Sequence, residues 1–281
     1  MRILITGAEG QVGRALCHKF SGKDVIALGK SKLDITKKDQ LTTLLLDVKP
    51  DVVFHCAAYT QVDQCEKDKK KPYEVNAIAT GLMAQACELV GAKLIYYSSD
   101  YVFNGEKKTP YMENDQTDPL STYGMSKWIG ERLVQQLSSK ATIIRTSWVF
   151  GHGGKNFVNT MVNLAKQKKV IQVIEDQVGS PTYAEDLAAY SASIMLHPPG
   201  IYHVTNGGSC SWYDFAKRIY EESGYDPSLI QPISSVDYGV QTKRPYYSVL
   251  DHKRLLEQGL QAPRKWEAAL KEYLRKEFAN D

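Results

Sequence analysis

Tyr123 and Lys127 stand four residues apart in the stretch 121–131, Ser-Thr-Tyr-Gly-Met-Ser-Lys-Trp-Ile-Gly-Glu. Side chains four residues apart share one face of a helix. A lysine ammonium beside a phenol, whose ordinary pKa is about 10, favours the phenolate and lowers that pKa. A tyrosine tuned in this way can pass a proton to a carbonyl oxygen near neutral pH.

The same spacing also arises for purely structural reasons. The chain holds 17 Tyr and 35 Lys and Arg residues, and a second pair, Tyr213 and Lys217, has the same separation. We interpret that second pair as structural, because it lies on an amphipathic helix and no serine at a strand end precedes it. The meaning of the first pair therefore depends on the elements that position it.

A glycine-rich turn comes directly after the first apolar run. The run Arg2–Thr6 has β character, and Gly7, Gly10 and Gly13 follow it and open a helical pattern. A strand, a glycine-rich turn and a helix in this order are the context of a dinucleotide-binding site, where the pyrophosphate lies against the helix N-terminus. The spacing Gly-x-x-Gly-x-x-Gly differs from the Gly-x-Gly-x-x-Gly form, and a simple turn is the alternative.

The second strand bears on the choice of dinucleotide. Asp24–Leu28 is followed by Gly29-Lys30-Ser31, where an Asp or Glu would usually bind the ribose 2′-hydroxyl of NAD(H). The missing acid and the basic Lys30 favour a 2′-phosphate and hence NADP(H), although a loop lysine can be merely solvated. Asp34, a little further on, is a candidate for a helix N-cap or for an adenine contact.

Strands and helices alternate five times up to about residue 150. Further strands are expected over residues 51–55, 93–97 and 141–146, with helices over 72–90 and 123–137. This alternation predicts an α/β fold with a Rossmann-like, doubly wound parallel sheet. Residues 1–150 are the predicted NADP(H)-binding domain. Residues 151–281 are a smaller mixed α/β substrate-binding part, interleaved with the first because no linker separates them.

Composition excludes several other classes of protein. The 281 residues have a net charge of +3 without a basic face, and no apolar run is long enough to span a membrane. The five cysteines are scattered, without the spacing of a zinc site or a disulfide framework. We therefore expect a cytoplasmic protein that binds neither nucleic acid nor membrane.

The chain resembles the extended branch of the short-chain dehydrogenase/reductase superfamily, and within it the dTDP-4-dehydrorhamnose reductases. The resemblance covers residues 1 to about 255. The motifs that carry it are Ala57-Ala58-Tyr59-Thr60-x-Val62-Asp63, Ser98-Ser99-Asp100-Tyr101-Val102-Phe103-x-Gly105, Tyr123-Gly124-x-Ser126-Lys127, Arg145-Thr146-Ser147-Trp148-Val149-Phe150-Gly151, Asp176-Gln177-x-Gly179-x-Pro181-Thr182 and Arg244-Pro245.

This resemblance implies an oxidoreductase that reduces the C4 ketone of dTDP-4-dehydro-L-rhamnose to dTDP-L-rhamnose. NADPH is the expected hydride donor, and NADH is left open as a second cofactor. Tyr123 would protonate the developing alkoxide, and Ser99 would donate a hydrogen bond to the carbonyl oxygen. Lys127 would lower the pKa of Tyr123 and hold the nicotinamide ribose.

Two further groups of residues follow from the resemblance and from the glycine-rich turn. The expected cofactor-binding residues are Gly7, Gly10, Gln11, Val12, Gly13, Lys30, Asp34, Ile35, Ala57, Ala58, Tyr59, Asn76, Tyr123 and Lys127. The expected substrate-binding residues are Thr60, Val62, Asp100, Tyr101, Trp148 and Arg244. Three of these residues could instead have a purely structural role: Asn76 as a helix residue, Trp148 as a core residue and Arg244 as a solvent-exposed residue or a loop contact.

Related chemistries differ beside the strand-end serine. Sugar 4,6-dehydratases resemble this chain but need an Asp-Glu pair there, whereas Asp100 is followed by Tyr101. Neither position is the cysteine of the fucose-type epimerase/reductases. The remaining interpretation is a plain 4-ketoreductase.

Several alternatives stay open. The methionine adenosyltransferase β subunit resembles these reductases and acts as a non-catalytic, NADP-binding regulatory partner. Another 4-keto sugar nucleotide is also an option as substrate. The chain is expected to be a monomer or a homodimer. Glu185 lies where some relatives bridge a dimer with metal, but we expect no metal.

Overall fold

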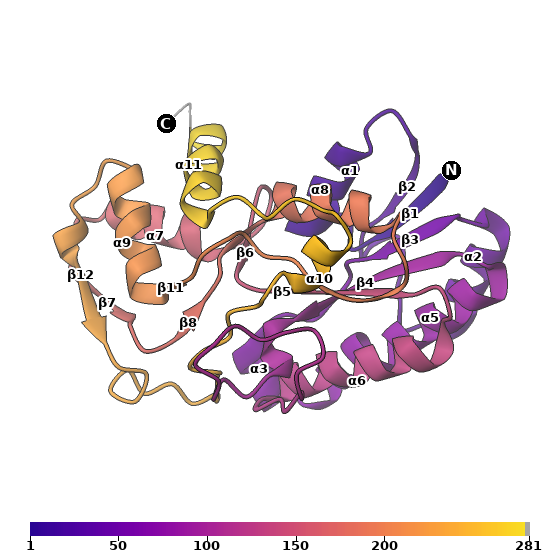
Figure 1. Ribbon diagram of the computed structural model, residues 1–281, viewed down its shortest axis with the longest axis horizontal. Helices are drawn as coiled ribbons and strands as arrows, with labels where there is room; N and C mark the ends of the chain where they lie inside the picture. Colours follow the sequence, from indigo (N-terminus) through magenta and orange to yellow (C-terminus); the bar gives the residue numbers. More distant parts are fainter. Residues whose placement is uncertain (279–281) are drawn as a thin grey trace.

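A six-stranded parallel sheet lies at the centre of the computed structural model, which describes residues 1–278 (Figure 1). All neighbouring strands in it run parallel. In spatial order the strands are β2 (Asp24–Leu28), β1 (Arg2–Thr6), β3 (Val52–His55), β4 (Lys93–Ser99), β5 (Thr142–Thr146) and β10 (Gly200–His203). The prediction of an α/β fold with a doubly wound parallel sheet is therefore confirmed.

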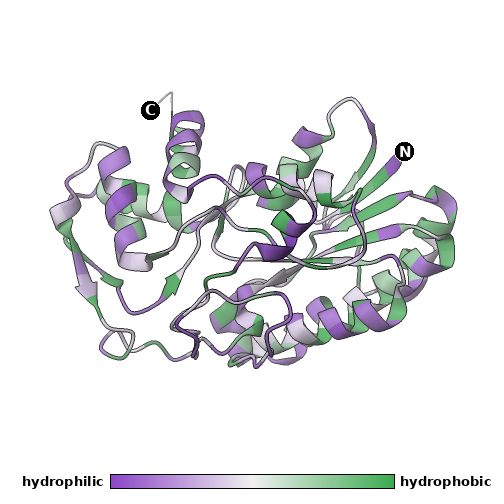
Figure 2. Ribbon diagram, in the orientation of Figure 1, coloured by the Kyte–Doolittle hydropathy of each residue, from purple (hydrophilic) through white to green (hydrophobic). Residues whose placement is uncertain are grey.

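Helices cover both faces of this sheet because its strands are apolar on both sides (Figure 2). One face packs against α1 (Gln11–Lys19) and α8 (Ala184–Ile194). The other face packs against α2 (Lys38–Val48), α5 (Ala79–Val90) and α6 (Thr122–Leu137). Each interface is a continuous core of buried aliphatic and aromatic side chains.

The chain reverses its direction of progress across the sheet at β1. This strand pairs with β2 on one side and with β3 on the other. The loops after β1 and β3 therefore leave toward opposite faces and open a crevice at the carboxyl edge of the sheet. In doubly wound folds this is where ligands bind.

The segment before α5 is more irregular than the predicted helix over residues 72–90. It starts with α3 (Val62–Lys67) and α4 (Lys70–Pro72) and continues through a π-helical turn, η1 (Tyr73–Ile78), into α5. Such turns are rare and often occur at functional sites. A regular helical pattern in the sequence gives no signal for one.

A second lobe follows β5, at the other end of the molecule from α2 (Figure 1). Its core gathers buried side chains from its helices and short strands around Phe215 and Tyr273. Its strands are β6 (Val149–Phe150), β7 (Ile171–Ile174), β8 (Val178–Gly179), β9 (Thr182–Tyr183), β11 (Cys210–Ser211) and β12 (Ile230–Ile233). Its helices are α7 (Phe157–Ala165), α9 (Trp212–Glu222) and α11 (Trp266–Glu277).

The remaining elements are short. They are η2 (Asp100–Val102), η3 (Pro227–Leu229) and α10 (Lys253–Glu257). The chain crosses back between the lobes after residue 150, since α8 and β10 belong to the sheet although they lie within the predicted second part. A boundary at residue 150 stays a prediction. Within residues 1–278, the helices are too short or too polar to cross a membrane.

Candidate active site

The glycine-rich turn between β1 and α1 has a shape that only glycine allows. Gly7 has φ +62°, and a Cβ there would lie 2.6 Å from the backbone nitrogen of Ala57. A Cβ on Gly13 would lie 2.3 Å from the carbonyl oxygen of Gly7. Helix α1 begins at Gln11 with Gly10 as its N-cap. The first N–H groups of a helix lack partners within it, so this turn fits a pyrophosphate.

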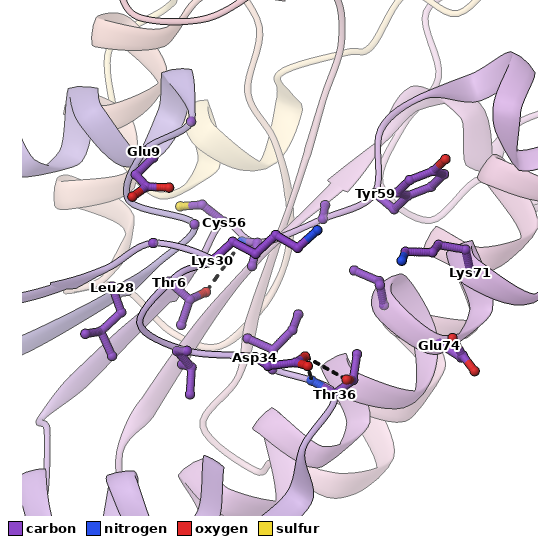
Figure 3. Close-up of a pocket in the computed structure, with 18 residues that line it drawn as sticks. Thr6, Glu9, Leu28, Lys30, Asp34, Thr36, Cys56, Tyr59, Lys71 and Glu74 are labelled. Atoms are coloured by element: carbon purple, nitrogen blue, oxygen red, sulfur yellow. Dashed lines mark hydrogen bonds between the residues drawn. The ribbon is translucent and has the colours of Figure 1, made fainter. Parts of the chain in front are cut away.

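Two cavities meet around this turn. The β2-side cavity, of about 380 Å³, lies between the glycine-rich turn and the loop after β2 (Figure 3). The β4-side cavity, of about 500 Å³, extends from the same turn to the carboxyl ends of β4 and β5. Gly7, Gly10, Cys56 and Ala58 line both cavities. An elongated ligand can therefore run past the turn from one cavity into the other.

Most of the predicted site residues line one of these cavities. Those in the β2-side cavity are Gly7, Gly10, Lys30, Asp34, Ile35, Ala57, Ala58 and Tyr59. Those in the β4-side cavity are Gly7, Gly10, Gln11, Val12, Gly13, Ala58, Thr60, Val62, Ser99, Asp100, Tyr101, Tyr123, Lys127 and Trp148. Their predicted roles stay predictions. Asn76 and Arg244 are not among the lining residues of either cavity.

Ser99, Tyr123 and Lys127 converge from two elements on one wall of the β4-side cavity. Ser99 ends β4, while the other two lie in the first turns of α6, which Ser121 caps by accepting from the backbone nitrogen of Gly124 at 3.2 Å. The Ser99 hydroxyl lies within hydrogen-bonding reach of the Tyr123 side chain. The predicted catalytic set is thus assembled by the sheet and one capped helix.

Burial controls the electrostatics of this wall. It raises the pKa of Tyr123 well above its ordinary value, and the hydrogen bond from Ser99 opposes the rise only in part. It also lowers the pKa of Lys127 to about 7, against the opposing influence of the Glu131 carboxylate. Burial is thus the largest influence on both groups, and the expectation that Lys127 lowers the pKa of Tyr123 stays a prediction.

Two contacts hold the side chain of Lys127 at the base of the cavity. Only 2% of its surface is exposed. Its Nζ donates to the carbonyl oxygen of Tyr97 at 2.6 Å and lies 4.3 Å from the centre of the Tyr96 ring. These contacts fix the amine between β4 and the cavity.

Asp100 is buried behind Ser99 and is held by hydroxyl groups. Its carboxylate accepts from Ser99 at 2.9 Å and from Ser248 at 2.6 Å. Burial raises its pKa to about 6, although both hydrogen bonds oppose the rise. Tyr101 follows and packs edge-on against Tyr123, with ring centres 5.7 Å apart. Asp100 therefore orients Ser99 and ties β4 to the segment after residue 245.

Trp148 forms the far wall of the β4-side cavity in a strained backbone conformation. Its φ is +47°, a region that residues with side chains rarely adopt. Its indole stacks on Trp212, with ring centres 3.5 Å apart and planes 10° apart. A side chain at Gly179 would displace it, since a Cβ there would lie 2.6 Å from the indole. The two indoles present a flat apolar surface to the cavity.

Asn76 supports the loop after β3 from behind the two cavities, and its expected contact with the cofactor stays a prediction. It is fully buried in η1, where its Oδ1 accepts from the backbone nitrogen of Tyr59 at 2.7 Å. Its Nδ2 donates to the carbonyl oxygen of Tyr59 at 2.9 Å and to Oγ of Ser126 at 3.0 Å. Asn76 thus clamps the loop after β3 to α6.

Two other candidates have local partners. Arg244 donates to both carboxylate oxygens of Asp63, at 2.8 and 2.9 Å, which matches the loop-contact alternative. Asp34 accepts from the backbone and the hydroxyl of Thr36, and these bonds lower its pKa. It is not a helix N-cap, because α2 begins only at Lys38.

Glu185 pairs with His18, with Oε2 3.1 Å from Nδ1. In the part of the chain that the structure describes, no three His, Cys, Asp or Glu side chains are grouped as a metal site requires. The expectation of no metal stays a prediction. The second tyrosine–lysine pair lies on α9, where Lys217 Nζ stands 5.5 Å from the Tyr213 ring. Neither residue lines the two cavities, which supports the structural interpretation.

Many of the residues that line the two cavities were not predicted, and four of them serve as examples. Trp212 and Lys155 line the β4-side cavity, and Glu9 and Lys71 line the β2-side cavity. Glu9 stands inside the glycine-rich turn, so its sequence position could have indicated it. The other three reach the site only through the folding of distant segments, for which the sequence offers no local signal.

Comparisons with known proteins agree with this geometry. A family model described as "RmlD substrate binding domain" matches residues 1–278. The spore coat polysaccharide biosynthesis protein SpsK of Bacillus subtilis is 46% identical over 98% of this chain and 97% of its own length. A probable dTDP-4,6-dihydroxy-2-methyloxan-3-one 4-ketoreductase of Streptomyces antibioticus is 39% identical over 97% of this chain and 94% of its own length.

The fold is also that of a solved structure. The crystal structure of dTDP-4-dehydrorhamnose reductase from Bacillus anthracis in complex with NADP superposes with a TM-score of 0.95. The two chains are 40% identical, and the match covers 98% of this chain and 99% of that one.

Proposed function

The chain belongs to the RmlD substrate binding domain family, and on that premise we propose that it is an NADPH-dependent reductase of the C4 ketone of a dTDP-linked sugar. The specific substrate that we propose is dTDP-4-dehydro-L-rhamnose, with dTDP-L-rhamnose as product. The observation that carries the proposal is the convergence of Ser99, Tyr123 and Lys127 on a cavity that begins at the glycine-rich turn. A cytoplasmic location, and a monomer or homodimer, remain part of the proposal.

The residues around the turn suit a dinucleotide. The N–H groups at the start of α1 would hold the pyrophosphate, and the β2-side cavity would take the adenosine. Lys127 would hold the nicotinamide ribose from the base of the β4-side cavity. The dinucleotide, when bound, supplies the hydride that reduces C4 of the sugar.

The chain's own residues supply the proton. Tyr123 would transfer its phenolic proton to the oxygen that becomes the alcohol, and the Ser99 hydroxyl would turn from Asp100 to donate its hydrogen bond to the same oxygen. The high pKa that burial gives Tyr123 keeps it protonated and ready to donate. Lys127, when charged, stabilises the phenolate that remains. Hydride and proton together convert the ketone to a secondary alcohol.

The neighbours of Ser99 support reduction without elimination. Tyr101 occupies the position where a dehydratase would carry its second acid, and burial raises the pKa of its phenol further. It packs on Tyr123 inside the same cavity. A group that stays protonated at this point does not serve as a base for removing water from the sugar.

Tyr123→Phe provides the direct test. We expect NADPH consumption with dTDP-4-dehydro-L-rhamnose to fall roughly 10²–10⁴-fold, because the proton donor is lost. NADPH affinity should change little, since the ring remains. Tyr213→Phe, in the second tyrosine–lysine pair, is the matched control and should keep full activity. Full turnover by Tyr123→Phe would overturn the assignment.

Substrate choice is the second question, because relatives with similar identity carry different names. A panel of dTDP-linked 4-keto sugars compared by kcat/KM will rank them, and a higher value for another sugar would replace dTDP-4-dehydro-L-rhamnose as the proposed substrate. The same panel tests the binding-only alternative. A wild-type chain that binds NADPH but reduces none of these sugars would favour a regulatory subunit.

A further inference from the structure

The end of β2 lacks the acidic side chain that usually binds the cofactor ribose. A carboxylate from another loop occupies the same position. Gly29 follows β2 directly and has no side chain. A Cβ built on it would lie 2.2 Å from Cδ and 2.3 Å from Oε1 of Glu9. Glu9 belongs to the glycine-rich turn and lines the β2-side cavity (Figure 3). Its carboxylate thus fills the space that a side chain at position 29 would occupy.

This position separates the two nicotinamide dinucleotides. An acid at the end of the second strand accepts a hydrogen bond from the ribose 2′-hydroxyl of NADH, whereas a 2′-phosphate requires a cation there. We propose that Glu9 is a specificity-determining residue of the cofactor site, which supports binding of NADH and weakens binding of NADPH. The inference rests on the dinucleotide binding in the proposed function and extends it.

Lys30 acts in the opposite direction. It follows Gly29, lines the same cavity and extends its amine across it in Figure 3. Among the residues that the structure describes, no ion pair joins its amine to Glu9, so each charge is available to a ligand. An anion and a cation at one ribose produce a cofactor site of mixed preference. The ratio of the two affinities then depends on the balance between Glu9 and Lys30.

The test measures binding of each dinucleotide to the whole chain by calorimetry, without any sugar. For Glu9→Gln we expect NADPH to bind roughly fivefold more tightly, since a negative charge beside its 2′-phosphate is removed. NADH should bind roughly fivefold more weakly, because an amide is a poorer acceptor than a carboxylate. Lys30→Met should weaken NADPH selectively and leave NADH unchanged.

Glu74→Gln is the matched control. Glu74 also lines the β2-side cavity, but it lies on the far wall beside Lys70, with 3.5 Å between Oε1 and Nζ. Its loss should alter the two affinities by equal, small factors. If Glu9→Gln also leaves the ratio of the two affinities unchanged, the proposal is overturned.

A second variant relocates the acid. Gly29→Asp combined with Glu9→Gln returns a carboxylate to the usual position at the end of β2, and only the flexible end of residue 9 has to move to admit it. We expect this double variant to recover the NADH affinity that Glu9→Gln loses. If the NADH affinity does not recover, a carboxylate at this position does not bind the ribose, and the proposal is contradicted. Failure of the wild-type chain to bind either dinucleotide would instead overturn the proposed function.

Discussion

At the scale of single residues, Lys127 combines burial with a proposed role that needs a positive charge. The residue is 2% exposed, and burial lowers its pKa to about 7. Below that pH the ammonium predominates and can stabilise a phenolate on Tyr123. Above it the neutral amine predominates and this stabilisation disappears. The proposed reduction should therefore depend on pH through a lysine.

We expect kcat/KM for reduction to fall as pH rises through about 7, far below the ordinary range of lysine titration. Lys127→Arg keeps its charge at every accessible pH, so in that variant the fall should move to higher pH even if the maximum rate is reduced. Parallel pH profiles of the two proteins provide the measurement. Lys217→Arg is the control and should reproduce the wild-type profile. A wild-type profile that stays flat to about pH 9 would contradict this mechanism.

The positions of Tyr123, Lys127 and Ser99 in one site could be predicted from the sequence for a physical reason. Two of them lie one turn apart on a helix, and the third ends an apolar strand, so local patterns place them. Trp212 gives no such signal, because it meets Trp148 only when two distant segments pack together. The pKa of Tyr123 could not be predicted either, since it depends on burial, which no local sequence pattern indicates.

At the scale of elements, the clamp made by Asn76 joins three parts of the fold. The residue sits in the π-helical turn η1, and its amide bonds the backbone of Tyr59 after β3 and the side chain of Ser126 on α6. Loops are the weakest part of such a site, and this one forms a wall of both cavities through Ala58. The clamp therefore makes a cavity wall rigid although Asn76 itself lines neither cavity.

Asn76→Ala should lower the free energy of unfolding by about 2–4 kcal/mol, because it removes the three hydrogen bonds that this fully buried side chain makes with Tyr59 and Ser126. Dinucleotide affinity should fall as well, since the loop after β3 loosens. Urea denaturation and calorimetric titration measure the two effects. Asn163→Ala, on an exposed face of α7, should stay within about 0.5 kcal/mol of wild type. Unchanged stability in Asn76→Ala would refute the clamp.

Elements were predictable to different degrees. The expected bounds of β1 and β2 agree with the structure, because short apolar strands flanked by turn residues carry a clear local signal. The π-helical turn was not predictable, since its residues form part of an ordinary helical pattern. The two-residue strands β6, β8, β9 and β11 were not predicted, because pairing across the second lobe, not propensity, creates them.

At the scale of the whole molecule, segments of the central sheet alternate along the chain with segments of the second lobe. Helix α8 and strand β10 come after β6–β9 in the chain, yet they complete one face and one edge of the central sheet. Leu187 on α8 is fully buried in the core beneath that face. Loss of packing there should consequently affect the sheet and the second lobe together.

We expect Leu187→Ala to lower the free energy of unfolding by about 2–5 kcal/mol, as cavity-forming substitutions in a core do. Far-ultraviolet circular dichroism and tryptophan fluorescence should report the same transition, because the lobes unfold as one unit. Leu196→Ala is the control, since that side chain is 78% exposed just beyond α8. Two separate transitions in the wild-type chain would show that the lobes are independent.

Strand β10 also has a consequence for the synthesis of the protein. Until it emerges from the ribosome, β5 has a partner only in β4, and its other side presents unpaired backbone groups. More than fifty residues lie between the end of β5 at Thr146 and the start of β10 at Gly200. At roughly 5–20 residues per second, the nascent sheet keeps that open edge for several seconds. We therefore expect the edge of β5 to be open to incorrect strand pairing until β10 has been synthesised.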